Sequence, residues 1–137
     1  MTNNDLHSPD LFRVMDANLN RLREGIRVVE DILRYKENNK QLASKLKELR
    51  HQAQTADTKE LLAYRDSVND VLKPSTKSEK NRENLESIII ANFKRAQESA
   101  RVLEELYKLN NLATSEKFKN IRYALYTLEK ETLLQKA

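Results

Sequence analysis

Apolar residues recur at alternating spacings of three and four along two long stretches of the chain. One face of an α-helix repeats in this way, so both stretches are predicted to be long amphipathic helices. The first begins at Ser8-Pro9-Asp10, where serine can cap and proline tolerates the first helical position, and ends near Lys36. The second runs from about Ser78 or Glu79 to Leu109. Their apolar faces are Met15, Leu19, Leu22, Ile26, Val29 and Leu33 in the first helix, and Leu85, Ile89, Phe93, Ala96, Ala100 and Leu103 in the second.

A shorter helix is predicted after each long one. One begins at Asn38 or Asn39, and the other is capped by Ser115 and runs to about Leu134. The stripe of the first short helix is Leu42, Leu46, Leu49 and Ala53. Two antiparallel helices joined by a few residues form an αα-hairpin, so the chain is predicted to contain two of these hairpins.

The segment between the two hairpins has signals of its own. Asp57-Thr58-Lys59-Glu60 has capping-box spacing, which predicts a short third helix. This helix is expected to end in the turn-forming stretch from Arg65 to Asp70. The basic connection from Lys73 to Arg82 contains Pro74 and is predicted to be a mobile loop.

A polar sequence of the first long helix occurs again in the second. Residues 16–35 read DANLNRLREGIRVVEDILRY, and residues 91–109 read ANFKRAQESARVLEELYKL. At a shift of 74 positions, Ala17, Asn18, Arg21, Glu24, Arg27, Val28 and Glu30 are identical to Ala91, Asn92, Arg95, Glu98, Arg101, Val102 and Glu104. At a shift of 72 positions, Lys117, Phe118, Lys119, Ile121 and Arg122 match Lys45, Leu46, Lys47, Leu49 and Arg50.

The repeat therefore covers a whole hairpin. A duplicated αα-hairpin predicts an all-α helical bundle of four long helices with an approximate internal two-fold axis. We expect a single helical domain over residues 1–137, with repeats at 12–56 and 86–134 and an insert at 57–80 that carries the short helix.

Composition excludes several classes of protein. The chain has no cysteine, and its two histidines are not spaced as zinc ligands. Gly25 is the only glycine and lies inside a predicted helix, so no P-loop or dinucleotide fingerprint can form. The longest apolar run, residues 88–91, is too short to cross a bilayer, and the first ten residues do not read as a signal peptide. We expect a cytoplasmic protein with no membrane partner, and its net charge of +4 suits an anionic ligand.

The repeated charges permit two interpretations. Arg-x-x-Glu-x-x-Arg is typical of a ladder of exposed ion pairs within a helix, each worth about 0.2–0.5 kcal/mol. Alternatively, Arg21, Glu24 and Arg27 face Arg95, Glu98 and Arg101 in a shared cleft where the two long helices meet. A single copy would favour the ladder, but duplication of the neutral Asn18 as Asn92 gives the two interpretations equal weight, because weak surface pairs do not require an amide in register. Such a cleft would suit phosphate and a divalent cation.

Four segments resemble a known family. DANLNRLREGIRVVED, AYRDSVND, ANFKRAQESARVLEEL and IRYALYTLE follow one another as in the small hydroxymethylpyrimidine-phosphate kinases of bacterial thiamin biosynthesis. These kinases occur alone or fused in front of thiamin-phosphate synthase, and the chain has the length of the free-standing form. The likeness extends from Phe12 to Glu129, with Leu72 standing where the family has glycine. It implies ATP-dependent conversion of 4-amino-5-hydroxymethyl-2-methylpyrimidine phosphate to its diphosphate, and a functional link to thiamin-phosphate synthase.

Chemistry assigns candidate roles for that reaction. Arginine holds phosphate bidentately, carboxylates hold Mg²⁺, and amides read a pyrimidine edge. The catalytic candidates are Arg21, Arg27, Arg95 and Arg101; the substrate-binding candidates are Asn18, Asn92, Arg65 and Arg122; the Mg²⁺ ligands are Glu24, Glu98, Asp66 and Asp70. Arg65 and the loop from Lys73 to Arg82 are expected to close over ATP. The expected partners are the phosphorylated pyrimidine and ATP, with no nucleic acid, and a homodimer stays possible.

Three other functions compete with this one. The strongest is a non-catalytic helical regulatory or docking module associated with thiamin-phosphate synthase. An all-α nucleotide pyrophosphohydrolase needs Glu-x-x-Glu pairs, which the spacing from Glu24 to Glu30 does not supply. RNA binding would use the basic residues and the tyrosines, although tyrosines at helical spacing more often border a core.

Overall fold

The computed structural model describes residues 9–76 and 82–135, and every regular element within them is helical. The elements are α1 (Pro9–Asp31), the π-helical turn η2 (Ile32–Lys36), α2 (Lys40–Gln52), α3 (Thr58–Ala63), α5 (Leu85–Tyr107) and α6 (Leu112–Gln135). The all-α bundle prediction is confirmed. The predicted cap Ser8 and residues 77–81 of the predicted loop lie outside the described residues.

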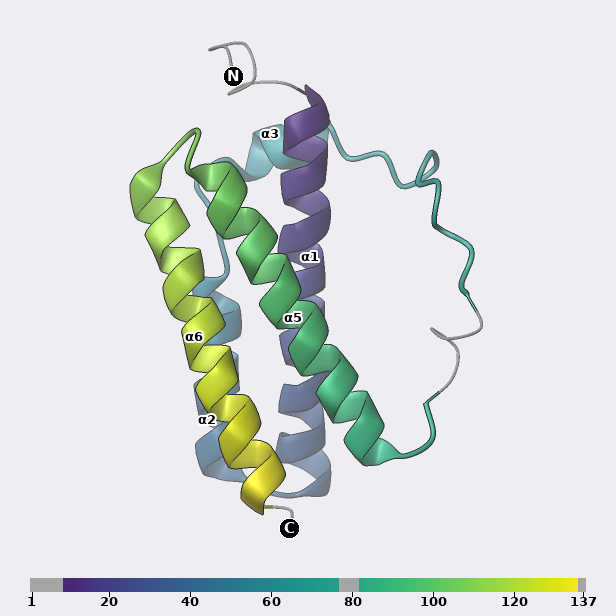
Figure 1. The fold of residues 1–137 in the computed structure, drawn as a ribbon, viewed down its shortest axis with the longest axis vertical. Coiled ribbons are helices and arrows are strands. Elements are labelled where there is room, and N and C mark those ends of the chain that lie inside the picture. Colours follow the sequence, from purple (N-terminus) through teal and green to yellow (C-terminus); the bar gives the residue numbers. More distant parts are fainter. Residues whose placement is uncertain (1–8, 77–81, 136–137) are drawn as a thin grey trace.

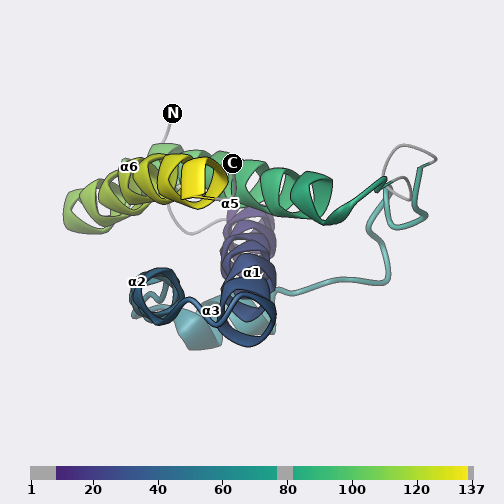
Figure 2. The same ribbon diagram turned by 90° about the horizontal axis from the view of Figure 1, so that it is seen from below.

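The helices form two hairpins stacked in two layers. In Figure 1, α5 crosses in front of α1 at an angle, and α6 lies in front of α2. Figure 2 shows the same molecule from below, with α5 and α6 in one layer and α1 and α2 in the other. The main contact between the layers is that of α1 with α5, and α2 also touches α6. The duplication thus brings its two long helices against each other, as expected.

The core contains the predicted stripes of α1, α2 and α5, joined by residues of α6, which has no predicted stripe: Phe118, Ile121, Leu125 and Leu128. Leu22, Leu46, Ile89, Phe93 and Leu103 are completely or almost completely inaccessible to solvent. Burying a side chain of this size stabilises the fold by about 1.5–3 kcal/mol. Leu19 and Leu85, at the borders of their stripes, are only partly buried against the core. The three-and-four periodicity therefore predicts the interior correctly.

The predicted helix ends are less accurate. The helix α5 begins at Leu85 instead of Ser78 or Glu79, because Asn84 and Ser87 form a reciprocal capping box. Ser115 is not a cap: it lies inside α6, and its hydroxyl donates to the backbone oxygen of Glu104 at 2.7 Å. The amide of Asn111 supplies the cap oxygen instead, accepting from the backbone N–H of Thr114 at 3.1 Å.

The capping box predicted at Asp57 is also absent. Asp57 makes no side-chain cap on α3; instead both of its carboxylate oxygens lie 3.0 Å from the hydroxyl of Tyr107. Burial raises the pKa of Tyr107, which keeps this hydroxyl a donor. The contact ties the start of the insert to the end of α5. It replaces a local hydrogen bond with a long-range one.

The turn between α1 and α2 has the predicted length but contains a π-helical segment that the pattern does not indicate. The first helix continues as the π-helical turn η2, so that the helical path ends at Lys36 as predicted. Asn38 then adopts a positive φ of 54°, which asparagine tolerates better than most residues. Asn39 caps α2 by accepting from the backbone N–H of Leu42 at 3.0 Å. The predicted asparagine start of α2 is confirmed.

Candidate functional site

The helices α1 and α5 approach most closely at Gly25. A Cβ atom at this position would lie 3.0 Å from the backbone oxygen of Asn92 and 3.4 Å from the Cβ of Ala96. The repeat places Ser99, also small and buried, at the position in α5 that corresponds to Gly25. Small residues at these two positions let the backbones come together, and the longer side chains around them form the walls of a cleft.

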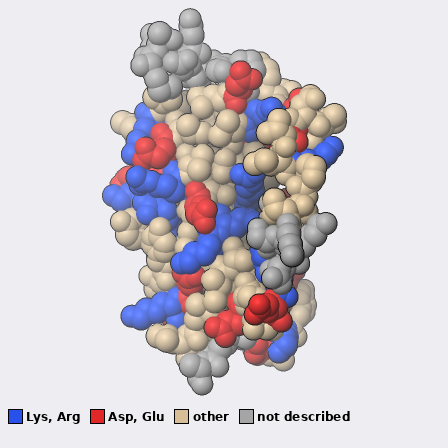
Figure 3. Space-filling model, turned by 45° about the vertical axis from the view of Figure 1, so that its right-hand side comes forward, with Lys and Arg blue, Asp and Glu red and all other residues tan. Residues whose placement is uncertain are grey.

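This cleft contains four of the repeated charged residues. A pocket of about 550 Å³ is lined by Arg21 and Glu24 from α1 and by Arg95 and Glu98 from α5. We call it the axial lobe; its other lining residues include Asn18, Asp70, Leu72, Lys94 and Ser99. Figure 3 turns this side of the molecule forward and shows Lys and Arg side chains gathered across its middle, with acidic side chains among them. The predicted shared cleft is confirmed for these four residues.

Arg27 and Arg101 lie elsewhere, so the geometric prediction is wrong for them. Arg27 pairs with Asp31 at 3.2 Å, and Arg101 pairs with Glu104 and Glu105, each at 3.3 Å. Residues three apart on an α-helix are rotated by about 60° from one another, so the second step from Arg21 turns a side chain out of the cleft. These pairs lie within single helices, as the alternative interpretation expects, but they join each arginine to a carboxylate three or four residues further along the chain and not to Glu24 or Glu98.

A second pocket opens beside the first. This insert lobe, of about 520 Å³, lies between α1 and the segment that follows α3. Its lining includes Arg13, Asn20, Arg65, Asp66 and Ser67, and it shares Asn18, Arg21 and Asp70 with the axial lobe. The two lobes therefore form one continuous cleft, and Arg21 stands where they join.

Asp16 fixes the insert against α1. Nε and Nη2 of Arg65 each donate to a different oxygen of the largely buried Asp16 carboxylate, at 2.8 Å. This hydrogen bonding raises the pKa of Arg65. Arg13 adds a bond of 2.9 Å to the backbone oxygen of Asp66. Sequence reasoning missed Asp16, although the repeat gives a signal: its equivalent in α5 is the apolar Ile90.

The two predicted metal ligands in the insert shape its backbone. Asp66 accepts from the backbone N–H and the side-chain amide of Asn69, at 3.1 and 2.6 Å, and this bonding lowers the pKa of Asp66. Asp70 accepts from the backbone N–H of Leu72 at 2.9 Å. Over the described ranges, no three Asp, Glu or His side chains gather as an all-protein metal centre. Mg²⁺ needs only one or two carboxylates when phosphates supply the remaining oxygens. The carboxylates of the cleft, which include Glu24 and Glu98, fit this way of binding Mg²⁺.

The repeated asparagines make equivalent bonds but have different surroundings. Asn18 donates to the backbone oxygen of Val14 at 2.9 Å, and Asn92 donates to that of Ile88 at 2.8 Å. Asn18 lines both lobes, whereas Asn92 lines neither. Only Asn18 is therefore placed to meet a ligand in the cleft.

Arg122 lies away from the cleft. Two of its nitrogens donate to one oxygen of the Glu104 carboxylate, at 3.1 and 2.9 Å, and both side chains are almost fully buried. The first hairpin contains the corresponding pair, Arg50 with Glu30, at 2.7 and 3.2 Å. These repeated pairs brace the two helices of each hairpin. The position of Arg122 indicates a structural role.

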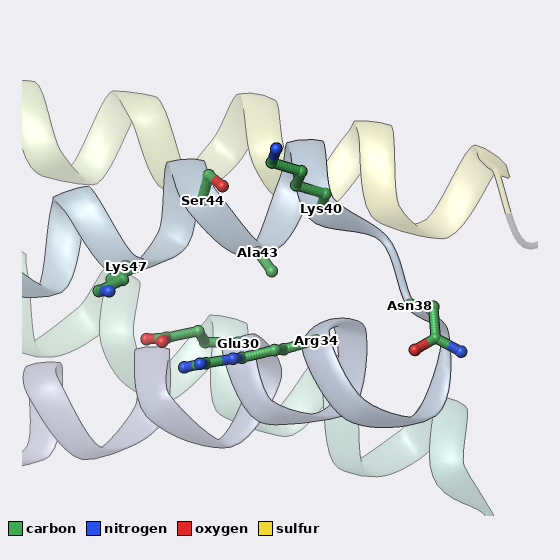
Figure 4. Close-up of a pocket in the computed structure, with 7 residues that line it drawn as sticks. All are labelled: Glu30, Arg34, Asn38, Lys40, Ala43, Ser44 and Lys47. Atoms are coloured by element: carbon green, nitrogen blue, oxygen red, sulfur yellow. The ribbon is translucent and has the colours of Figure 1, made fainter.

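A further pocket of about 310 Å³ lies between α1, η2 and α2 (Figure 4). Glu30 and Arg34 extend side by side along one wall, facing Ala43 of α2. The Glu30 carboxylate is already paired with Arg50, and no predicted site residue lines this pocket. The continuous cleft on α1 is therefore the better candidate.

Among the described helices, none is long and apolar enough to cross a membrane.

Comparison with known proteins identifies the family. A model of the ThiD2 family matches residues 13–131. The chain belongs to the ThiD2 family. No solved structure matches this ThiD2 chain.

Its curated relatives are longer proteins named thiamine-phosphate synthase. That of Nostoc punctiforme is 42% identical over 123 residues, which are 87% of this chain and 34% of the relative. That of Thermosynechococcus vestitus is 39% identical over 128 residues, which are 90% of this chain and 36% of the relative. The ThiD2 chain thus spans about a third of the length of the curated relatives it matches.

The charge pattern of the ThiD2 cleft suits a phosphorylated ligand. Across the part of the chain that the structure describes, Arg27, Arg50, Arg65, Arg101 and Arg122 form salt bridges, whereas Arg21 and Arg95 form none. Within the same described residues, Arg13, Arg23 and Arg34 also form none, but none of these three lines the axial lobe. A guanidinium without a carboxylate partner can donate two parallel hydrogen bonds to a phosphate. The cleft therefore holds two arginines that are free to bind an anion, one on each wall.

Proposed function

We propose that the chain is a phosphotransferase of thiamin biosynthesis that converts ATP and hydroxymethylpyrimidine phosphate to ADP and hydroxymethylpyrimidine diphosphate. The observation that carries the proposal is the pair Arg21 and Arg95, repeated in sequence, free of salt bridges and placed on opposite walls of one cleft. The sequence resemblance and the ThiD2 match support the assignment of the chain to thiamin biosynthesis. The absence of a glycine-rich loop agrees with phosphate binding by side chains.

The proposed chemistry needs no catalytic histidine. The acceptor is a phosphate monoester whose attacking oxygen is already ionised, so no general base has to remove a proton. The protein must bring two polyanions together and neutralise them, which Arg21 and Arg95 do. Mg²⁺ held between the phosphates and Glu24 or Glu98 would neutralise further charge. Arg27, Arg101 and Arg122 are left out of this proposal because all three lie outside the cleft.

Asn18 is the proposed reader of the pyrimidine. Its amide N–H₂ group bonds to the backbone of Val14, which orients the side chain. Its carbonyl oxygen can then accept a hydrogen bond from the exocyclic amine of an aminopyrimidine. The insert lobe, with Asn20 and Ser67 in its lining, adjoins the same position. Arg65 shapes this lobe through Asp16.

Activity is tested by coupled ADP release with purified protein, ATP, Mg²⁺ and hydroxymethylpyrimidine phosphate. Turnover above the ATPase background is expected in the wild type. Arg21→Ala should lower kcat/KM by about 100-fold or more, because electrostatic groups at a reacting centre contribute on that scale. Arg34→Ala removes the same charge outside the cleft and serves as the control. Unchanged circular dichroism and Tm would show that the fold persists.

The alternative is a non-catalytic module associated with thiamine-phosphate synthase. It is supported by the names of the relatives, of which this chain covers only a third. Complete lack of turnover in the wild type, together with binding to a thiamine-phosphate synthase domain, would favour the module and overturn the kinase proposal.

A further inference from the structure

The axial lobe is built from equivalent residues of the two repeats. Arg21 and Arg95 are repeat partners, as are Glu24 and Glu98, and all four line the same pocket. When two equivalent elements pack across a two-fold axis, equivalent residues meet near that axis. The buried pairs Glu30–Arg50 and Glu104–Arg122 follow the same duplication. The internal two-fold axis therefore passes through the axial lobe, between Arg21 and Arg95.

The proposed reaction has a matching symmetry. A donor phosphate and an acceptor phosphate stand on opposite sides of the transferred phosphoryl group, roughly in line with it. An oxygen of the acceptor phosphate bonds to the γ-phosphorus of ATP. The bond from that phosphorus to the bridging oxygen breaks, and its electron pair stays on the β-phosphate of ADP. The transition state thus carries phosphate at each end and needs cationic groups on both sides, with the greater charge on the side of the nucleotide.

We infer that phosphoryl transfer takes place on the internal axis, with Arg21 holding the acceptor phosphate and Arg95 holding the phosphates of the donor. This assignment rests on the proposed kinase function and gives each repeat one substrate. The duplicated helix supplies one phosphate-binding arginine for each substrate at equivalent positions, so that neither substrate needs a glycine-rich loop.

Departures from the repeat decide which substrate lies on which side. The insert lobe adjoins Arg21 and is lined by the neutral amides of Asn18 and Asn20, which suit a small heterocycle. In α5 the equivalent of Asn20 is Lys94, which lines the axial lobe and makes one exposed salt bridge to Glu129 at 3.2 Å. Within the axial lobe, the α5 wall thus has one more basic residue than the α1 wall, although Lys94 is paired with Glu129 and Arg13 of α1 lines the adjoining insert lobe. That wall suits the more highly charged substrate, which is the nucleotide triphosphate.

Separate measurements on the two arginines test the assignment. Arg21→Gln should raise the KM for hydroxymethylpyrimidine phosphate by about tenfold or more while changing the KM for ATP by less than about threefold. Arg95→Gln should do the reverse, and both variants should lower kcat. Calorimetric titration of each variant with ADP alone, and with the pyrimidine phosphate alone, gives the same comparison without turnover. Lys94→Asn gives α5 the residue that α1 has at the equivalent position, Asn20. It should weaken the binding of ADP and leave the binding of the pyrimidine phosphate unchanged.

The possible results distinguish a failure of the substrate assignment from a failure of the proposed kinase function. A wild-type protein without kinase turnover overturns the proposed function. An active wild type in which both arginine variants weaken the same substrate, or in which the two effects are exchanged, overturns only the assignment of substrates to repeats. Retained Tm values in all three variants confirm that the measured changes arise in the cleft.

Discussion

At the residue scale, the chain uses the same side-chain types for different purposes. Glu30 and Arg50 form a buried pair that braces the first hairpin, and Glu104 and Arg122 do so in the second. Arg21, only a few residues away in sequence, has no salt bridge and faces a cleft. Burial and partner, not residue type, separate the structural arginines from the candidate functional ones.

Removal of one partner should reveal the structural role of the buried pair. Arg50→Met leaves the Glu30 carboxylate buried without its bidentate donor, which is expected to lower the free energy of unfolding by about 3 kcal/mol. Arg27→Met breaks the exposed pair with Asp31 and should cost less than about 1 kcal/mol. Urea denaturation at neutral pH measures both. Equal costs would contradict the distinction.

At the element scale, helix faces are better predicted than helix ends. The faces of α1, α2 and α5 follow from spacing alone, because a 3.6-residue period repeats over several turns. The ends depend on single side chains that choose between local and distant partners. Asp57 has the local sequence of a capping box, yet its carboxylate accepts from Tyr107. Ser115 has the type of a cap, yet its hydroxyl reaches Glu104.

The start of α5 can be tested at its cap. Asn84→Ala removes the side-chain oxygen that accepts from the backbone N–H of Ser87 at 2.8 Å, so it should lower the free energy of unfolding by about 1 kcal/mol. Glu83→Ala, at the exposed residue before the cap, should leave stability unchanged within about 0.5 kcal/mol. A larger cost at Glu83 than at Asn84 would contradict the assignment of Asn84 as the cap.

At the scale of the whole molecule, the bundle and the insert have separable roles. The helices α1, α2, α5 and α6 form a common core to which the segment after α3 contributes little, since Val68, Val71 and Leu72 are largely exposed. That segment nevertheless forms one side of the insert lobe. We therefore expect the core to determine stability and the insert to contribute binding.

Replacement of the insert tests this division. A Gly/Ser linker of equal length in place of residues 66–76 keeps Arg65 and its bonds to Asp16 but removes Asp66, Ser67 and Asp70 from the cleft. Tm is expected to fall by no more than a few degrees, since long surface segments tolerate exchange. Affinity for hydroxymethylpyrimidine phosphate, measured by calorimetry, should fall about tenfold or more. Unfolding of the bundle would show that the insert belongs to the core.

The sequence by itself determined the helical class, the apolar faces and the duplication, because helical periodicity and repeated residues are local properties of the chain. It also selected Arg21, Glu24, Arg95 and Glu98, since duplicated helices that pack together bring equivalent residues to one axis. The domain limits derived from the repeat stay a prediction.

Only the tertiary structure decided which repeated charges share the cleft. The contact between α1 and α5 leaves Arg27 and Arg101 outside the pocket that holds Arg21 and Arg95, and the approach of the insert engages Asp16 with Arg65. Side chains far apart in sequence meet only after the hairpins stack. Their pairing is therefore a property of packing, which no local pattern in the chain records.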